Sequence, residues 1–352
     1  MDNFTAIGHW LISWFEENKR DLPWRDTTDP YKIWISEIIL QQTRVNQGLD
    51  YYYRFIGRFP DVASLAEAKE QEVLKYWQGL GYYSRARNLH KTARIVMEQY
   101  GGAFPQDYRE VLQLKGVGEY TAAAIVSFAW NKPYPAVDGN VFRVLSRLFA
   151  SDTPIDTQKG KKYFTDIARM IMPKDRAGDF NQATMEFGAL QCVPKSPDCT
   201  GCTLNTTCQA YLEGDVNKYP VKTNKTKTKD VYLYYFFIKQ NGHTYLKQRT
   251  GKGIWENLFE FPSIESETLL DFEDLIKHSS FKSLFQDKHT SYQFNRKIQD
   301  KKHVLSHRNL YATLYHVNVE PTFALSDDYI RIKEEDLVRY PVHRLMQYFV
   351  EG

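Results

Sequence analysis

The sequence predicts a multidomain chain with an all-helical part over residues 1–217 and an α+β part over residues 230–352, joined by a basic linker at 218–229. Helix caps and apolar residues at helical spacing recur through the first part. The linker carries five lysines, a proline and no acidic residue. After it, β-branched and aromatic runs bounded by turn residues replace the helical pattern. The length of 352 residues also favours two domains over one.

The helices of the first part are expected where capping residues precede apolar stretches. Asp29 and Pro30 form an N-cap followed by proline at the first helical position, so a helix should run through about Val45. Asp61 can cap the next helix. The expected ranges are 30–45, 61–79, 84–100, 120–130 and 141–149.

The second part contains strand and hairpin signals. Asn241-Gly242 is a turn signal of the type I′ hairpin, and it stands between two β-rich runs. A helical stretch is expected at 269–277. The expected strands are 231–238, 244–248, 303–306 and 311–319.

Composition limits the class of protein. The chain is 42% hydrophobic and 25% charged, which favours a folded chain over a disordered one. The net charge of +3 permits nucleic-acid binding without indicating it. We find no signal peptide and no apolar stretch of about 18 residues, so a protein of the cytoplasm that does not enter the membrane is expected.

All four cysteines lie within seventeen residues, at Cys192, Cys199, Cys202 and Cys208. Such a cluster indicates a soft-metal centre more often than disulfides. Zinc is one alternative, because Cys-x2-Cys pairs are common in zinc sites. The gaps of six, two and five residues instead resemble the [4Fe–4S] loop of the endonuclease III and MutY superfamily. The resemblance implies a structural cluster that braces the loop 192–208, where Lys195 could meet a phosphate.

Two glycines, Gly116 and Gly118, precede an alanine-rich helix. Glycine lets the backbone approach a ligand, and the N–H groups at a helix start suit a phosphate, although an ordinary helix–helix turn is the plainer interpretation. Asp138 follows some twenty residues later, and together they resemble the helix-hairpin-helix glycosylase signature. Asp138 can also cap the helix at 141–149, where the helix dipole and backbone donors should hold it ionised.

Glu37 is a carboxylate in a helix that is otherwise apolar on every face except at Ser36. An unpaired buried carboxylate is costly or becomes neutral. A structural ion pair with Arg20, Arg25 or Arg44 would explain it. A general acid with a raised pKa would explain it equally well.

Three long segments resemble motifs of the MutY family. They are Trp-Ile-Ser-Glu-Ile-Ile-Leu-Gln-Gln-Thr-Arg-Val at 34–45, Arg-Asp-Leu-Pro-Trp-Arg at 20–25 and Gly-Leu-Gly-Tyr-Tyr-Ser-Arg-Ala-Arg-Asn at 79–88. The resemblance covers the first 215 residues or so in order. It implies an all-α helix-hairpin-helix glycosylase domain. Bifunctional members of the superfamily carry lysine at the position of Tyr120, so the resemblance implies a monofunctional enzyme.

The implied reaction is hydrolysis of the N-glycosidic bond of adenine mispaired with 8-oxoguanine or guanine in double-stranded DNA, as part of base excision repair. By this resemblance, Glu37 protonates the adenine and Asp138 stabilises the oxocarbenium sugar. Tyr120 and Asn140 orient Asp138 and the sugar. The enzyme is expected to act as a monomer, in the nucleoid of a bacterial cell.

Adenine must leave the stack before its glycosidic bond can be reached. The resemblance implies that other residues bind the flipped adenine, fill the gap in the duplex or hold the backbone. They are Arg25 and Glu186 for the adenine, and Gln42, Thr43, Tyr82, Gly116 and Gly118 for the DNA.

The second part resembles the MutT-like (Nudix-like) domain of MutY proteins. The catalytic Nudix box is absent, so pyrophosphate hydrolysis is not expected. The family's recognition loop reads Phe-Ser-His, and here Leu305, Ser306 and His307 occupy it. A hydrogen bond to 8-oxoguanine remains plausible, whereas the stacking of an aromatic residue is lost at Leu305. An ordinary strand end with a turn is the plainer interpretation.

Three alternative functions remain open from the sequence. A bifunctional lyase of the same superfamily is disfavoured by Tyr120 and by the second domain. A zinc-stabilised DNA-binding module without catalysis would leave Glu37 unexplained, and a brown colour of the purified protein would exclude it. A Nudix hydrolase is disfavoured by the missing box.

Overall fold

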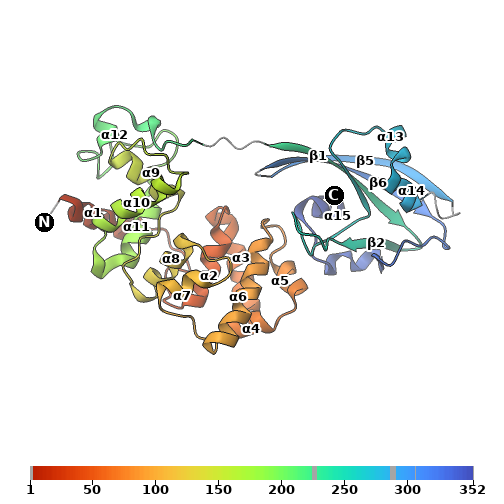
Figure 1. The fold of residues 1–352 in the computed structure, drawn as a ribbon, viewed down its shortest axis with the longest axis horizontal. Helices are drawn as coiled ribbons and strands as arrows, with labels where there is room; N and C mark the ends of the chain where they lie inside the picture. Colours follow the sequence, from red (N-terminus) through yellow and green to blue (C-terminus); the bar gives the residue numbers. More distant parts are fainter. Residues whose placement is uncertain (1–2, 224–227, 286–290, 306, 352) are drawn as a thin grey trace. The chain divides into compact units, whose positions relative to one another are not determined.

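The computed structural model describes residues 3–223, 228–285, 291–305 and 307–351. The chain forms two compact units, one of residues 1–67 and 91–224, the other of residues 68–90 and 225–352. The N-terminal part is helical and the C-terminal part contains the sheets, so the predicted fold class is confirmed (Figure 1). The predicted linker includes residues 224–227, which lie outside the described part, and its limits remain a prediction.

The helical part is a succession of short and medium helices joined by turns and longer loops (Figure 1). They are α1 (Asn3–Asn18), α2 (Pro30–Leu40), α3 (Val45–Arg58), α4 (Val62–Glu67), α5 (Glu70–Tyr76), α6 (Ser84–Tyr100), α7 (Tyr108–Gln113), α8 (Glu119–Trp130), α9 (Gly139–Leu148), α10 (Gln158–Ile171), α11 (Ala177–Leu190) and α12 (Gln209–Leu212).

The first expected helix is too long. Asp29 caps α2 as predicted, since its side chain accepts a hydrogen bond from the Tyr31 amide. However, α2 ends at Leu40, and α3 begins at Val45. Gln42 adopts a left-handed backbone with φ 57°, which a continuing helix cannot contain. The break therefore ends the predicted helix at Leu40, and a second helix starts at its predicted end.

The helix expected at 61–79 is likewise two helices. The Asp61 side chain accepts from the Ser64 amide and starts α4, but the chain leaves the helix at Ala68 and Lys69 before α5. By contrast, α6 covers the expected range 84–100, and Gly101 and Gly102 end it with φ values of 61° and 87°. Positive φ values suit glycine, which has no Cβ to clash.

One core of the first unit lies among α1, α9, α10 and α11. Its fully buried members include Leu11, Leu145, Phe164 and Phe180. Cys192, Cys202 and Cys208 pack against the same core. The cysteine loop and α9 therefore pack against the same hydrophobic core.

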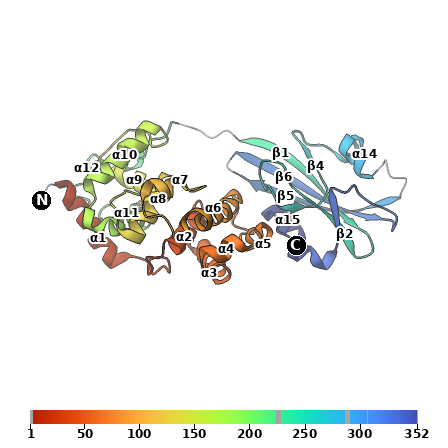
Figure 2. The same ribbon diagram turned by 60° about the horizontal axis from the view of Figure 1, so that its bottom comes forward.

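The second unit holds two sheets. Their strands are β1 (Lys229–Lys239), β2 (His243–Gln248), β3 (Phe259–Glu260), β4 (Ser263–Ser266), β5 (Tyr292–Val304), β6 (Arg308–Val319) and β7 (Tyr329–Lys333). One sheet has the order β4-β1-β6-β5, with β1 and β6 parallel, and the other has the order β3-β2-β7. Helix α14 (Ser279–Phe285) packs on the first sheet through Phe281 and Phe285 (Figure 2), and α13 (Phe272–Lys277) packs on the same core through Leu275. Helix α15 (Arg344–Glu351) follows at the end.

The Asn241-Gly242 turn forms as predicted, with φ values of 51° and 72°. Gln240 and His243 form an isolated bridge that closes this turn. In the described residues the two strands do not continue as a paired hairpin, because β1 and β2 belong to different sheets. Within the described residues, no helix is both long and apolar enough to cross a membrane.

Candidate active site

One cleft of about 690 Å³ in the first unit brings together the predicted catalytic and adenine-binding residues. Its walls come from α2, the α2–α3 turn, α8, the start of α9 and α11. A cleft of this size is typical of small-ligand sites. The predicted residues that line it are Arg25, Glu37, Gln42, Thr43, Tyr120, Asp138, Asn140 and Glu186.

The carboxyl group of Glu37 is buried at this cleft, with 7% of the residue exposed. Its Oε2 accepts a hydrogen bond of 2.7 Å from the Tyr120 hydroxyl. Burial raises the pKa of Glu37 to about 7, against the lowering effect of this hydrogen bond, and nearby Asp138 raises it further. The expected ion pair with Arg20 or Arg25 is not what the structure contains, because both arginines bind Glu186.

Asp138 caps α9 as predicted. Its Oδ1 accepts from the Val141 amide at 2.8 Å, and its Oδ2 accepts from Asn140 Nδ2 at 2.8 Å. Both donors lower the pKa of Asp138, as expected for groups that favour its carboxylate form, but burial outweighs them and raises this pKa above its ordinary value.

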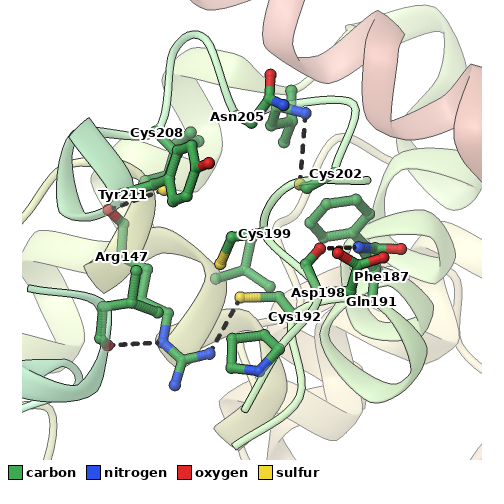
Figure 3. A pocket seen from close by; sticks show the side chains of 15 residues that line it. Arg147, Phe187, Gln191, Cys192, Asp198, Cys199, Cys202, Asn205, Cys208 and Tyr211 are labelled. Carbon is green, nitrogen blue, oxygen red and sulfur yellow. Dashed lines mark hydrogen bonds between the residues drawn. The ribbon is translucent and has the colours of Figure 1, made fainter. Parts of the chain in front are cut away.

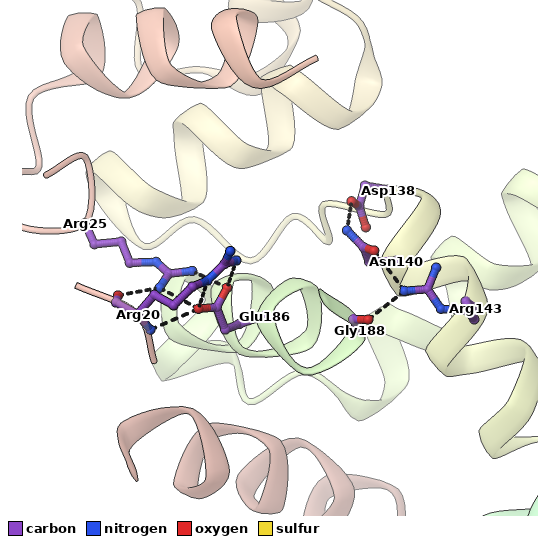
Figure 4. A network of polar contacts seen from close by, with 7 residues as sticks. All are labelled: Arg20, Arg25, Asp138, Asn140, Arg143, Glu186 and Gly188. Carbon is purple, nitrogen blue, oxygen red and sulfur yellow. Dashed lines mark hydrogen bonds and ion pairs between the residues drawn. The ribbon is translucent and has the colours of Figure 1, made fainter. Parts of the chain in front are cut away.

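The predicted adenine contacts Arg25 and Glu186 bind each other. Glu186 accepts from Arg25 at 3.0 and 2.8 Å, and from the side chain of Arg20 at 2.8 and 2.6 Å (Figure 4). Burial alone would raise the pKa of Glu186, but the hydrogen bonds from Arg20 and Arg25 lower it to about 2. Glu186 is therefore a fixed anion at one end of the cleft.

A chain of hydrogen bonds connects Asp138 with the start of the cysteine loop, and Figure 4 shows its part from Asp138 to Gly188. Arg143 donates to Asn140 Oδ1 at 2.9 Å, to the Gly188 carbonyl at 2.6 Å and to the Cys192 carbonyl at 2.8 Å. Asn140 in turn binds Asp138. Arg143 is a site residue that was not predicted from the sequence, although it follows Asn140 by three residues on a capped helix and therefore shares a helix face with it.

Tyr120 is expected beside Glu37 and Asp138, and its hydroxyl donates to Glu37 and also lies 3.2 Å from Met185 Sδ. Burial and these two carboxyl groups raise the pKa of Tyr120 well above its ordinary value, so the phenol stays protonated. Asn140 donates to Asp138, and the orienting roles of both residues stay predictions.

The predicted helix-hairpin-helix consists of α7, residues 114–118 and α8. Gly116 has φ 80°, a conformation that requires glycine, and the Thr92 hydroxyl holds the adjacent Lys115 carbonyl at 2.8 Å. Gly118 caps α8 in extended conformation, and a Cβ there would meet open space. Both glycines are exposed, so the amides at the start of α8 face solvent.

Two predicted DNA contacts have unusual backbones. Gln42 in the first unit and Tyr82 in the second have φ values of 57° and 47°. Both are exposed, and Tyr82 retains 47% of its surface. Left-handed non-glycine residues are concentrated at functional sites, because the fold must stabilise them. Thr43 lies beside Gln42 and binds the Gln41 carbonyl at 3.4 Å.

The four cysteines line one pocket (Figure 3). All four are free thiols. Arg147 donates to Cys192 Sγ at 3.4 Å and to the carbonyls of Val193 and Pro194, so it holds the start of the loop. In the described part of the chain, no three His, Cys, Asp or Glu side chains are grouped closely enough to hold a single metal ion.

The chemistry of this pocket fits a soft-metal group. Burial raises the pKa of the Cys202 thiol to about 11 and also raises those of Cys199 and Cys208. Thiolates at these positions therefore need a cationic partner. A sulfur-only donor set with apolar walls, including Val144 and Phe187, suits an iron–sulfur centre.

The predicted recognition residues lie at the hairpin between β5 and β6. Leu305 is half-buried and its amide donates to the Arg308 carbonyl at 2.8 Å, which closes the hairpin. His307 is exposed. Ser306 lies outside the described residues.

Two family models match the chain in succession. Residues 35–170 match the HhH-GPD superfamily base excision DNA repair protein, and residues 234–352 match the NUDIX domain. Among solved structures, a thermostable thymine-DNA glycosylase is 30% identical with a TM-score of 0.56, and covers 60% of this chain and 97% of its own. An endonuclease III–DNA complex at 23% identity and TM-score 0.53 shares the fold.

Full-length relatives extend the match across both parts. The adenine DNA glycosylase of Buchnera aphidicola from Acyrthosiphon pisum is 38% identical over 258 residues, which is 73% of this chain and 74% of the relative. The enzyme of the same name from the Schizaphis graminum strain is 34% identical over 88% of this chain and 86% of its own length. The chain is therefore a DNA N-glycosylase and belongs to the adenine DNA glycosylase (MutY) family.

Proposed function

We propose that this glycosylase hydrolyses the N-glycosidic bond of adenine opposite 8-oxoguanine or guanine in double-stranded DNA. One observation carries the proposal: a buried carboxyl group with a pKa near 7, that of Glu37, lines the same cleft as a second carboxylate, Asp138. Two carboxyl groups in different environments are the usual equipment for glycosidic hydrolysis.

Glu37 acts as the general acid in this proposal. With its pKa at about 7, a large share of the enzyme holds the carboxyl proton at neutral pH. The proton passes to the adenine ring nitrogen as the glycosidic bond breaks, and the electron pair of that bond leaves with the base. Tyr120 fixes the rotamer of Glu37 by donating to Oε2.

Asp138 stabilises the cationic sugar. The carboxylate form at the start of α9 is fixed by Val141 and Asn140, so it need not reorient when positive charge develops. Water then adds to the sugar. The neutral phenol of Tyr120 replaces the amine that a bifunctional enzyme would use, which supports a monofunctional reaction.

The flipped adenine lies against the Arg25–Glu186 pair at the other end of the cleft. Glu186 stays ionised and holds the Arg25 guanidinium in a fixed position, where its remaining N–H groups can donate to the base. Gln42, Thr43 and Tyr82 fill the space left in the duplex, and the amides after Gly116 and Gly118 bind a phosphate.

The cysteine pocket holds a [4Fe–4S] cluster bound by Cys192, Cys199, Cys202 and Cys208. The cluster supplies structural bracing of the loop 192–208. Arg147 and Arg143 keep the first turn of that loop attached to α9. Lys195 is exposed in the braced loop and can reach a phosphate.

The C-terminal domain reads the opposite base. Leu305, Ser306 and His307 form the recognition loop, in which Ser306 and His307 supply hydrogen bonds to 8-oxoguanine. The enzyme acts as a monomer on chromosomal DNA, in the bacterial nucleoid.

The decisive experiment is single-turnover adenine release from a duplex with adenine opposite 8-oxoguanine. Wild type should release adenine, while Glu37→Gln and Asp138→Asn should be slower by a factor of about 100 or more and still bind the duplex. Release of a different base, or full activity of both variants, would contradict the proposal. A duplex with adenine opposite thymine is the substrate control.

A further inference from the structure

Residues 68–90 and the C-terminal sheets form one compact unit, and a partly buried ion pair joins Arg87 to Glu256 within it. The Arg87 guanidinium donates to the Glu256 backbone carbonyl at 2.7 Å and to Glu256 Oε2 at 2.9 Å. The Arg87 side chain is only 9% exposed. A buried guanidinium with two such partners holds its neighbour firmly in one position.

Further polar contacts flank this pair. Asn257 Nδ2 donates to Glu70 Oε1 at 2.5 Å, and the Tyr83 hydroxyl donates to the Val342 carbonyl at 3.3 Å. Lys75 Nζ donates to the Tyr340 carbonyl at 3.3 Å. Arg87 therefore attaches the first turn of α6 to the loop at residues 253–258, and Tyr83, the residue after Tyr82, is attached to Val342.

That loop has a strained backbone. Trp255 and Asn257, on either side of Glu256, have left-handed φ values of 62° and 65°. Non-glycine residues keep such values only when their surroundings impose them. The surroundings here are a parallel stack of Trp255 on buried His343, with ring centroids 3.6 Å apart at 8°.

The same indole reaches the base of the recognition hairpin. The Trp255 ring lies 6.4 Å from the ring of His303 in β5, two residues before Leu305. The hairpin is closed by Leu305 and Arg308, and the Lys229 amide donates to the His307 carbonyl at 3.0 Å. The Trp255–His303 ring neighbourhood, the adjacency of Trp255 and Glu256 in the chain and the Glu256–Arg87 ion pair therefore link this hairpin to Arg87.

We propose that Arg87, Glu256 and Trp255 are positioning residues that couple reading of the opposite base to placement of the segment carrying Tyr82. This inference rests on the proposed function. Contact of the recognition hairpin with 8-oxoguanine favours one position of Trp255. That position fixes the adjacent Glu256, and the ion pair of Glu256 fixes Arg87 and the start of α6. Such coupling acts equally in both directions, as any equilibrium between two sites must.

The test compares single-turnover adenine release from duplexes with adenine opposite 8-oxoguanine and opposite guanine. The variants are Glu256→Gln, Arg87→Lys, the double variant and Trp255→Phe. The matched control is Arg339→Gln, which removes an arginine of the same unit from an exposed ion pair with Asp336. The preference for 8-oxoguanine should fall by about tenfold in the variants and stay unchanged in the control. The double variant should lose no more than the worse single variant.

Three results would overturn the inference. The first is an equal loss on both duplexes, because it would mean that the contacts only stabilise the fold. The second is an unchanged preference in every variant, while wild type prefers 8-oxoguanine. The third is additive losses in the double variant. If wild type releases no adenine from either duplex, the proposed function itself fails, which is a distinguishable result.

Discussion

At the scale of single residues, the Glu37 carboxyl group is subject to two opposing influences. Burial raises its pKa, and the Tyr120 hydroxyl lowers it by hydrogen bonding to the ionised form. The balance leaves the pKa at about 7, where a general acid operates at neutral pH. The apolar helix around Glu37 was visible in the sequence, but the Tyr120 contact joins positions 83 residues apart and was not.

This balance predicts the pH dependence of adenine release. The reactive form is protonated Glu37, so the single-turnover rate should fall as pH rises through about 7. Tyr120→Phe removes the hydrogen bond that favours the carboxylate, and the fall should therefore move to higher pH. Rates between pH 5.5 and 9, measured with enzyme in excess, give both curves. A wild-type profile without this fall, or an unshifted profile of Tyr120→Phe, would contradict the assignment.

The ion pairs that Glu186 forms with Arg20 and Arg25 could not be predicted from the sequence. They depend on how α11 packs against the N-terminal loop. The low pKa of Glu186 follows from that packing alone. Cysteine spacing, by contrast, is local, so the four cysteines could be assigned to one pocket from the sequence.

At the scale of elements, caps could be predicted and helix breaks could not. Asp29 and Asp138 cap their helices because a short carboxylate side chain reaches the amides of the first turn. The break after Leu40 has no proline or glycine to mark it. The fold imposes it by stabilising the left-handed Gln42, which then faces the cleft. Breaks of this kind arise from tertiary packing.

The glycines of the hairpin before α8 give a matched pair of variants. Gly116→Ala places a side chain at φ 80° and should cost about 1 kcal/mol or more of the free energy of unfolding. Gly118→Ala meets open space in an extended conformation and should leave that free energy nearly unchanged. Urea denaturation of both variants measures the difference. Equal destabilisation would show that the turn is not what requires Gly116.

At the scale of the whole molecule, the sequence predicted a helical part and a sheet-containing part, which the structure confirms. It did not predict that residues 68–90 would group with the C-terminal sheets. Arg87 and Glu256 are 169 residues apart in the sequence. Hydrophobic pattern and helix propensity are local properties, so they do not predict such a pairing. The helical period identifies α6, and includes α5 in a longer predicted helix, without identifying the partner of either.

This grouping predicts how the chain responds to loss of its C-terminal part. In a chain ending at Thr223, Arg87, Glu70 and Tyr83 lose the partners Glu256, Asn257 and Val342. The amides of residues 70–76 and 84–90 should then exchange with solvent faster, because their local opening costs less free energy. Those of α9 and α11, whose core is intact, should be unaffected. Native-state hydrogen exchange on the full and shortened chains measures both regions. Equal protection of residues 70–76 and 84–90 in the two chains would show that the helical part supports this segment by itself.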